Sequence, residues 1–181
     1  MDNGASSYRR YLNGEEEAFD RIIKDYYDRL VFFINSYVQS FAAAEDLAVD
    51  VFSDLIVHKR RYNFKTPLKT YLFMLGRSRA LNYIKRSKIV PTVELSEAEH
   101  LGTPSVEELY FADLRKQALY QALDQLEEQQ RTAIHLVYLE DLSCADAAAV
   151  MKKNTKQVYN LLYRAKERLR TILGMEGFDY E

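Results

Sequence analysis

Cationic and aromatic side chains alternate between residues 59 and 88, and these are the side chains best suited to bind a ligand. The stretch carries ten Lys or Arg residues, and no Asp or Glu occurs between Leu55 and Val93. The interleaved rings are Tyr62, Phe64, Tyr71, Phe73 and Tyr83. Cations follow a phosphate backbone, and flat rings stack on exposed bases with about 1–3 kcal/mol each. Because stacking requires unpaired bases, this composition indicates binding of single-stranded or melted nucleic acid.

Two plainer interpretations apply to the same residues. Tyr71, Phe73 and Tyr83 could belong to the hydrophobic core, and for Tyr71 we favour that interpretation. The ten bases could form an ordinary solvated surface, but such surfaces usually mix charges of both signs. The absence of any acid among them therefore favours a binding role.

Charge is divided into blocks along the chain, although the net charge is only −2. Residues 1–54 hold 11 acids and 5 bases, and residues 89–149 hold 12 acids and 3 bases. A second basic block at 150–173 has 7 bases and a single acid, Glu167. Two separate cationic regions in an otherwise acidic chain predict a polyanion that is bound at two places.

Signatures of catalysis, metal binding and membrane insertion are not found in the sequence. His58, His100 and His135 have no ligand-like spacing with each other or with Cys144, and no glycine-rich phosphate loop or nucleophile–base pair occurs. We therefore expect no enzymatic activity, no cofactor and no metal. The sequence contains no run of 18 apolar residues, which a membrane-spanning helix would require. Residues 1–17 lack the apolar segment of a secretory signal. A single cysteine fits a reducing compartment, so we expect a cytoplasmic protein.

The elements that must position these residues are predicted to be helices, because apolar residues recur at three- and four-residue spacing nearly throughout. Helices are expected from Glu15 through Ile34, from a cap at Ser40 through Ile56, and from Thr66-Pro67 to about Lys88. A capping box of Ser105 and Glu108 should begin the next helix. Shorter helices should follow at 127–140, 143–151 and 154–173, with Ser143 and Asn154 as caps and Gly174 as the stop. The fold class is therefore all-α: two small helical domains, 1–88 and 106–181, joined by a flexible acidic linker, 89–105.

The last two predicted helices and the four residues between them, Lys152 to Thr155, have the arrangement of a helix-turn-helix. One side of the second helix is apolar, with Val158, Leu161, Leu162, Ala165 and Leu169. The opposite side would meet base edges in a major groove, with Tyr159, Asn160, Tyr163 and Arg164. Cations nearer the phosphates would fix register, namely Lys152, Lys153, Lys156 and Arg168. The alternative is a solvated basic helix on a helical bundle.

Five segments resemble those of the extracytoplasmic-function sigma factors, bacterial members of the sigma-70 family. Residues 44–52, AEDLAVDVF, are similar to that family's A-E-D-L-x-Q-[DE]-x-F helix. Leu68 to Phe73, with Arg77, Ala80, Asn82 and Tyr83, resembles its F-[KR]-x-W-L-Y…R-N-x-A-x-[DN]-Y segment. The remaining similarities are Gly14 to Phe19 at the family's usual opening, and Leu123 to Ser143 and Val158 to Arg168 in its C-terminal domain. Together they cover about residues 10–172, in the family's order.

The resemblance implies a factor that recruits core RNA polymerase to promoter DNA, with two domains that contact two promoter elements. It implies polymerase contacts at Asp46, Leu47, Asp50 and Phe52. The loop from Asn63 to Pro67 would accept a flipped base of the minus-ten element. The residues expected at the minus-ten element are Arg61, Tyr62, Asn63, Phe64, Lys65, Lys69, Arg77, Arg79, Asn82, Lys85 and Arg86. The helix-turn-helix cations and polar residues named above would contact the minus-thirty-five element.

Alternatives from other classes remain at this point. A stand-alone helix-turn-helix regulator would act without polymerase, with an N-terminal half that dimerises or binds a ligand, and an RNA-binding adaptor would use the same basic block. By analogy with the family, an anti-sigma factor is expected as a further partner. Tight binding of a promoter duplex by the purified chain alone would favour the stand-alone regulator.

Overall fold

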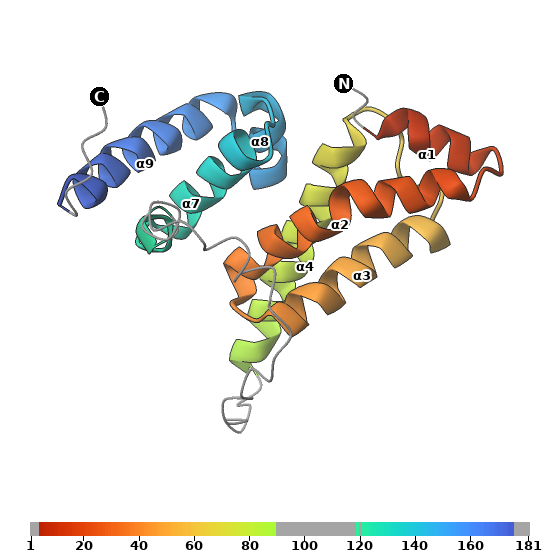
Figure 1. Ribbon diagram of the computed structural model, residues 1–181, viewed down its shortest axis with the longest axis horizontal. Helices are drawn as coiled ribbons and strands as arrows, with labels where there is room; N and C mark the ends of the chain where they lie inside the picture. The colour runs from red at the N-terminus through yellow and green to blue at the C-terminus, as the bar shows by residue number, and fades with distance from the viewer. Residues whose placement is uncertain (1–3, 90–118, 120, 176–181) are drawn as a thin grey trace.

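The computed structural model describes residues 4–89, 119 and 121–175 of the chain, and the ordered elements in these ranges are helices (Figure 1). The first four are α1 (Ala5–Leu12), α2 (Glu17–Val38), α3 (Phe41–Val57) and α4 (Leu68–Ile89). The others are α7 (Glu128–Ile134), the π-helical turn η1 (His135–Leu139), α8 (Cys144–Met151) and α9 (Thr155–Met175). The predicted all-α class is confirmed. The predicted linker and the Ser105–Glu108 capping box lie outside the described residues, apart from position 89.

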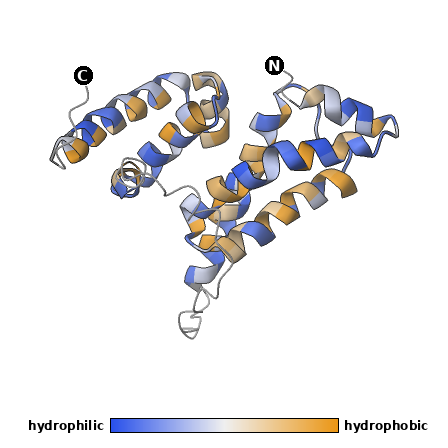
Figure 2. Ribbon diagram, in the orientation of Figure 1, coloured by the Kyte–Doolittle hydropathy of each residue, from blue (hydrophilic) through white to orange (hydrophobic). Residues whose placement is uncertain are grey.

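The N-terminal unit is built around the apolar side of α2. Helices α1, α3 and α4 all contact α2, and Leu30, Phe33 and Ile34 are fully buried among them. Figure 2 shows hydrophilic and hydrophobic residues alternating along α2, as expected of a helix with one buried side. Gly76 allows α4 to approach closely, since a Cβ there would lie 2.8 Å from Cδ1 of Leu30. Close packing of this kind fixes how α4 presents its other side to solvent.

Helix boundaries in this unit follow local backbone chemistry. Ser40 caps α3, because its Oγ accepts a hydrogen bond from the backbone N–H of Ala43 at 3.4 Å. Helix α4 begins at Leu68, directly after the predicted Thr66-Pro67 signal, and ends one residue beyond the predicted Lys88. The cap at Ser40 and the end of α4 are confirmed, the latter to within one residue, whereas Pro67 precedes the helix instead of taking its first position.

The first helix, α1, was missed by the sequence analysis. Tyr8, Tyr11 and Leu12 have helical spacing, but the stretch is only eight residues long and periodicity over such a length is a weak signal. Gly14 takes a φ of 100° in the turn that follows, and α2 begins at Glu17 rather than at Glu15. The chain therefore reverses direction at this glycine and lays α1 against α2.

The C-terminal unit contains the predicted helix-turn-helix. The Oγ of Ser143 accepts a hydrogen bond from the backbone N–H of Asp146 at 3.0 Å at the start of α8. At the start of α9, Asn154 Oδ1 accepts from the N–H of Gln157 at 2.8 Å, and Gln157 Oε1 accepts from the N–H of Asn154 at 3.0 Å. This reciprocal pair is a capping box. Lys152 occupies the left-handed region at the turn, with φ of 54°. Gly174 does not stop α9, which continues to Met175.

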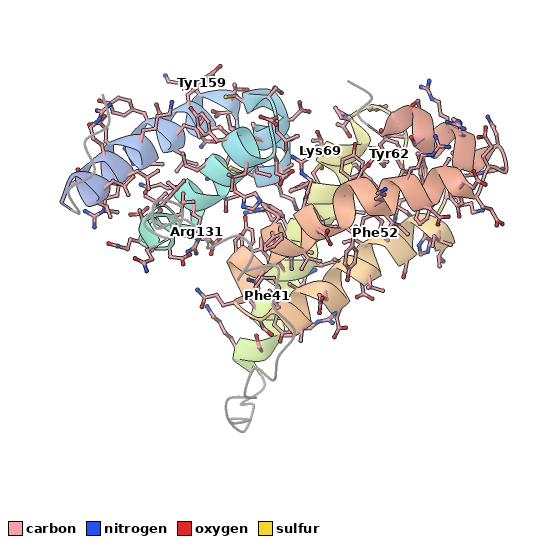
Figure 3. All side chains as sticks on the ribbon, in the orientation of Figure 1. Phe41, Phe52, Tyr62, Lys69, Arg131 and Tyr159 are labelled. Carbon is pink, nitrogen blue, oxygen red and sulfur yellow. The ribbon has the colours of Figure 1, made fainter. Side chains whose placement is uncertain are left out.

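The two units contact each other through α4 and α8, and through the residues around η1 (Figure 3). The hydroxyls of Tyr37 on α2 and Thr132 on α7 lie 2.7 Å apart and are buried. Thr70 on α4 donates a hydrogen bond to Asp146 Oδ1 on α8 at 3.1 Å. These contacts bring the start of α4, which lies inside the first basic block, against the helix-turn-helix.

Candidate nucleic-acid interface

Most of the first basic block faces solvent. Seven of its ten cations are exposed: Lys59, Arg60, Arg61, Lys65, Lys85, Arg86 and Lys88. The other three, Lys69, Arg77 and Arg79, are partly buried. The exposed group divides between the loop at residues 58–67 and the C-terminal half of α4, where Asn82 is also exposed. The exposed cations therefore form two groups, one on the loop between α3 and α4 and one on the C-terminal half of α4.

One end of this loop is held by a carboxylate on α3. Asp54 accepts from Nη1 of Arg61 at 3.1 Å and 3.0 Å on its two oxygens, and from Nδ1 of His58 at 2.9 Å. Arg79 on α4 lies 3.8 Å from the same carboxylate and 3.5 Å from Asp50. Burial alone would raise the pKa of Asp54, but the hydrogen bond and charge of Arg61 outweigh it and hold that pKa below its ordinary value. Asp54 is thus ionised at neutral pH and fixes the start of the loop.

The interior of the loop is closed by its own aromatic residues. The Tyr62 hydroxyl donates to the carbonyl oxygen of Thr66 at 2.6 Å, and the Tyr62 ring lies 4.6 Å from that of Phe64. Phe64 has a φ of 61°, a conformation that L-residues seldom adopt. Asn63 Oδ1 accepts from the N–H of Lys65 at 3.1 Å. The loop is a closed turn with Asn63 and Lys65 exposed at its surface.

Tyr62 and Lys69, both expected at the minus-ten element, are largely buried. Tyr62 is 2% exposed, so its ring is part of the core and supports the loop from within. The side chain of Lys69 is 13% exposed, because Glu140 of the C-terminal unit covers it. Both were predicted from residue type, which does not show what packs over a side chain.

Glu140 is a carboxylate buried between the two units. Its side chain is 5% exposed, and its Oε2 lies 2.9 Å from Nε of Arg29 and 3.1 Å from Nζ of Lys69. These are charge contacts without hydrogen-bond alignment, whereas Lys69 also donates a hydrogen bond to the Glu140 backbone carbonyl. Nε2 of His135 lies 3.6 Å from Oε1. A buried acid with two cationic partners ties η1 to α2 and α4.

The side of α3 expected to contact polymerase is acidic and apolar. Asp46 and Asp50 are exposed and Leu47 is partly buried. Phe52 is 4% exposed and packs edge-on against Phe19, with ring centroids 6.4 Å apart. Phe52 therefore belongs to the core of the N-terminal unit, where its side chain is not exposed for a direct contact.

The polar side of α9 is exposed to solvent. Tyr159, Asn160, Tyr163 and Arg164 are exposed, while Val158, Leu162 and Ala165 are buried on the other side. Among the cations predicted to contact phosphates, Lys152, Lys156 and Arg168 are exposed and Lys153 is partly buried. Figure 3 shows Tyr159 on the side of α9 away from the N-terminal unit. The predicted division of α9 into an apolar and a polar side is confirmed.

Comparison with known families identifies both units. Residues 22–89 match the model of sigma-70 region 2, and residues 116–169 match that of sigma-70 region 4. The chain belongs to the sigma-70 family. The first match covers α3, α4 and most of α2, and the second covers the helix-turn-helix. Polymerase-binding sigma factors, rather than stand-alone regulators, are the class that combines these two regions in one chain.

Relatives place this sigma factor in the extracytoplasmic-function (ECF) group. It is 29% identical over 164 residues to the ECF RNA polymerase sigma factor BldN of Streptomyces coelicolor, covering 88% of this chain and 62% of the relative. It is 24% identical to the ECF RNA polymerase sigma factor SigM of Bacillus subtilis, covering 84% and 93%. The sigma factor RpoE of Bartonella quintana, solved with the anti-sigma factor NepR, has a TM-score of 0.68 at 24% identity. That alignment covers 86% of this chain and 96% of RpoE.

Three features of this sigma factor were missed by the sequence analysis. Val49, Ile56 and Val57 form an exposed apolar group on α3, 51%, 45% and 73% exposed, beside the acids expected to contact polymerase. Their helical spacing was visible, but only the fold shows which side of α3 faces solvent. The other two features are the contact through Glu140 and the position of α1 against the loop. Within residues 4–89 and 121–175 there is no group of possible metal ligands, and none of the helices there is long and apolar enough to cross a membrane.

Proposed function

We propose that this chain associates with core RNA polymerase in the cytoplasm and directs it to promoters, where it helps to open the DNA. The observation that carries the proposal is the placement of two exposed cationic surfaces on separate units. One surface has a closed aromatic turn between α3 and α4, and the other is a helix-turn-helix. The first suits unstacked bases and the second suits duplex DNA.

Each surface receives a role on this proposal, within the domain boundaries expected above. Polymerase would contact the exposed side of α3, at Asp46, Leu47 and Asp50, with the apolar group at Val49, Ile56 and Val57 beside them. The minus-ten element would contact Arg61, Asn63, Phe64, Lys65, Arg77, Arg79, Asn82, Lys85 and Arg86. The minus-thirty-five element would contact Lys152, Lys153, Lys156, Tyr159, Asn160, Tyr163, Arg164 and Arg168.

Strand opening would be driven by binding alone. Unstacking and flipping bases costs a few kcal/mol, which stacking and phosphate contacts can offset. The factor would therefore contribute no catalytic group, and the polymerase would perform the chemistry.

A transcription assay with reconstituted holoenzyme tests the proposal. Core polymerase with the chain should initiate on a subset of a promoter-fragment library, and core polymerase alone should not. Asp50→Arg should abolish co-elution with core polymerase, because it reverses the charge at the centre of the proposed docking surface. Asp25→Arg, the same change on the exposed side of α2, serves as the matched control and should retain co-elution. Unchanged co-elution of Asp50→Arg would refute the docking assignment.

We also propose an inhibitory protein partner, and this proposal rests on related structures. Two proteins with related folds were solved with a protein partner: the sigma factor RpoE with the anti-sigma factor NepR, and CnrH with the cytosolic domain of CnrY. A protein of this class would compete with polymerase for the exposed side of α3. Added core polymerase should displace it from the purified complex.

A further inference from the structure

Helix α1 lies against the loop that carries the proposed minus-ten contacts. It precedes the region 2 match, which begins at residue 22. We propose that α1 fixes the conformation of the loop at residues 58–67, and that Tyr8 is a positioning residue for recognition of an unstacked promoter base. This inference rests on the proposed function, since it assigns a role within the same interface.

Tyr8 connects α1 to both sides of the junction between α3 and the loop. Its side chain is fully buried, and its hydroxyl lies 3.0 Å from the carbonyl oxygen of Leu55 and 3.1 Å from that of Lys59. One hydroxyl proton is thus shared between the last turn of α3 and the first residues of the loop. Burial, with smaller contributions from Tyr11 and Tyr71, raises the pKa of Tyr8 to about 12, so the hydroxyl remains a donor at neutral pH.

The rings of α1 extend this support to the closed turn. Tyr8 packs edge-on against Tyr62, with centroids 5.5 Å apart, and lies 6.1 Å from Phe64. The guanidinium of Arg9 lies 4.9 Å from the centroid of Phe64, and Nζ of Lys59 lies 4.6 Å from that of Tyr11. Phe64 is the residue with the unusual positive φ, so α1 contacts the turn where its backbone is most restricted.

These contacts matter for recognition because a flipped base must meet a preformed pocket. A loop that is not held in one conformation can re-pack around more than one base, so discrimination between bases would fall. Asp54 holds the loop at Arg61 from α3, and Tyr8 holds it from α1. Loss of the Tyr8 hydroxyl should therefore weaken the preference for one base without weakening polymerase binding.

The test compares Tyr8→Phe with Tyr37→Phe in reconstituted holoenzyme. Both variants lose one buried tyrosine hydroxyl contact, but Tyr37 bonds Thr132 at the contact between the units, far along α2 from the loop. Initiation is measured on promoters that differ at single positions of the minus-ten element. Tyr8→Phe should lower the ratio between the preferred and other bases by about tenfold at one position, the effect of one buried hydrogen bond. Tyr37→Phe should leave that ratio unchanged.

A second variant, Arg9→Gln, and hydrogen exchange in the free protein test the same role. Arg9 is exposed, so Arg9→Gln should preserve the fold and still lower the same ratio several-fold. In the free protein, Tyr8→Phe should speed hydrogen exchange at the amides of Arg61 and Lys65 relative to Tyr37→Phe. Equal losses on all promoters, or unchanged exchange, would overturn the role of α1. A wild-type holoenzyme that initiates nowhere would refute the proposed function instead, while the exchange result would still decide the inference.

Discussion

Arg164 lies where a side chain of α9 could contact a base edge. It is exposed on α9, on the same side as Asn160, while Leu162 and Ala165 are buried opposite it. A guanidinium in that position can pair bidentately with guanine in the major groove, and such a pair discriminates by about 1–3 kcal/mol. A phosphate contact at the same place would carry no sequence information.

Arg164→Ala should relax preference at one base-pair position of the upstream element. The measurement is holoenzyme binding to duplexes with every single substitution in that element. Arg170→Ala is the control, because Arg170 is exposed on the same helix but pairs with Glu167 at 2.8 Å. A uniform loss across all duplexes would show that Arg164 contacts phosphate.

At three of the predicted contact positions, the side chain is largely buried. Tyr62 and Lys69 were predicted because an aromatic ring or a cation suits a nucleic-acid contact, and Phe52 was predicted from the family resemblance. Phe52 and Tyr62 are instead core residues, and Lys69 pairs with Glu140. Lys65, from the basic block, and Asn63 and Asp50, from the resemblance, are exposed.

At the scale of the element, caps determine where the helix-turn-helix begins its second helix. Asn154 and Gln157 bond each other's backbone N–H groups, and both were visible in the sequence as polar residues three apart. The π-helical turn η1 was not predictable in this way. Leu139, the last residue of η1, and Glu140, which follows it, both contact Arg29, more than a hundred positions earlier in the chain.

Asn154→Ala should lower the free energy of unfolding by about 1 kcal/mol, because the first N–H groups of α9 lose their acceptor. Urea denaturation followed by circular dichroism measures the change. Asn160→Ala removes the same side chain from the exposed middle of α9, where alanine has the higher helix propensity, and should not destabilise. Equal destabilisation by both variants would contradict the capping role.

For the whole molecule, the contact through Glu140 limits what the two units can bind together. The two promoter elements, named for positions minus ten and minus thirty-five, lie about 25 base pairs apart on the DNA. That is roughly 85 Å at about 3.4 Å per base pair. A compact chain of 181 residues has a radius of gyration of about 16 Å. On the proposed function, the units would therefore have to separate before both surfaces meet their DNA elements, and separation would expose Lys69.

Glu140→Gln should favour that separation, because it leaves Arg29 and Lys69 without their buried counter-charge. Small-angle scattering should show a larger radius of gyration, and Lys69 should react faster with an acylating reagent. Glu128→Gln, at an exposed acid of α7, is the control and should change neither measurement. Unchanged reactivity of Lys69 would show that Glu140 does not hold the units together.

The sequence by itself determined most of the helices, though not α1 or the π-helical turn η1, together with the caps at Ser40, Ser143 and Asn154, the two cationic regions and the family. These depend on local properties: side-chain periodicity, hydrogen bonds within one turn, and charge that is close along the chain. Tertiary structure decided which of the chosen residues face solvent, that Tyr8 of α1 supports a loop some 50 positions later, and that Glu140 covers Lys69. Contacts of that kind depend on how helices pack, and packing brings together residues whose separation in sequence carries no local signal.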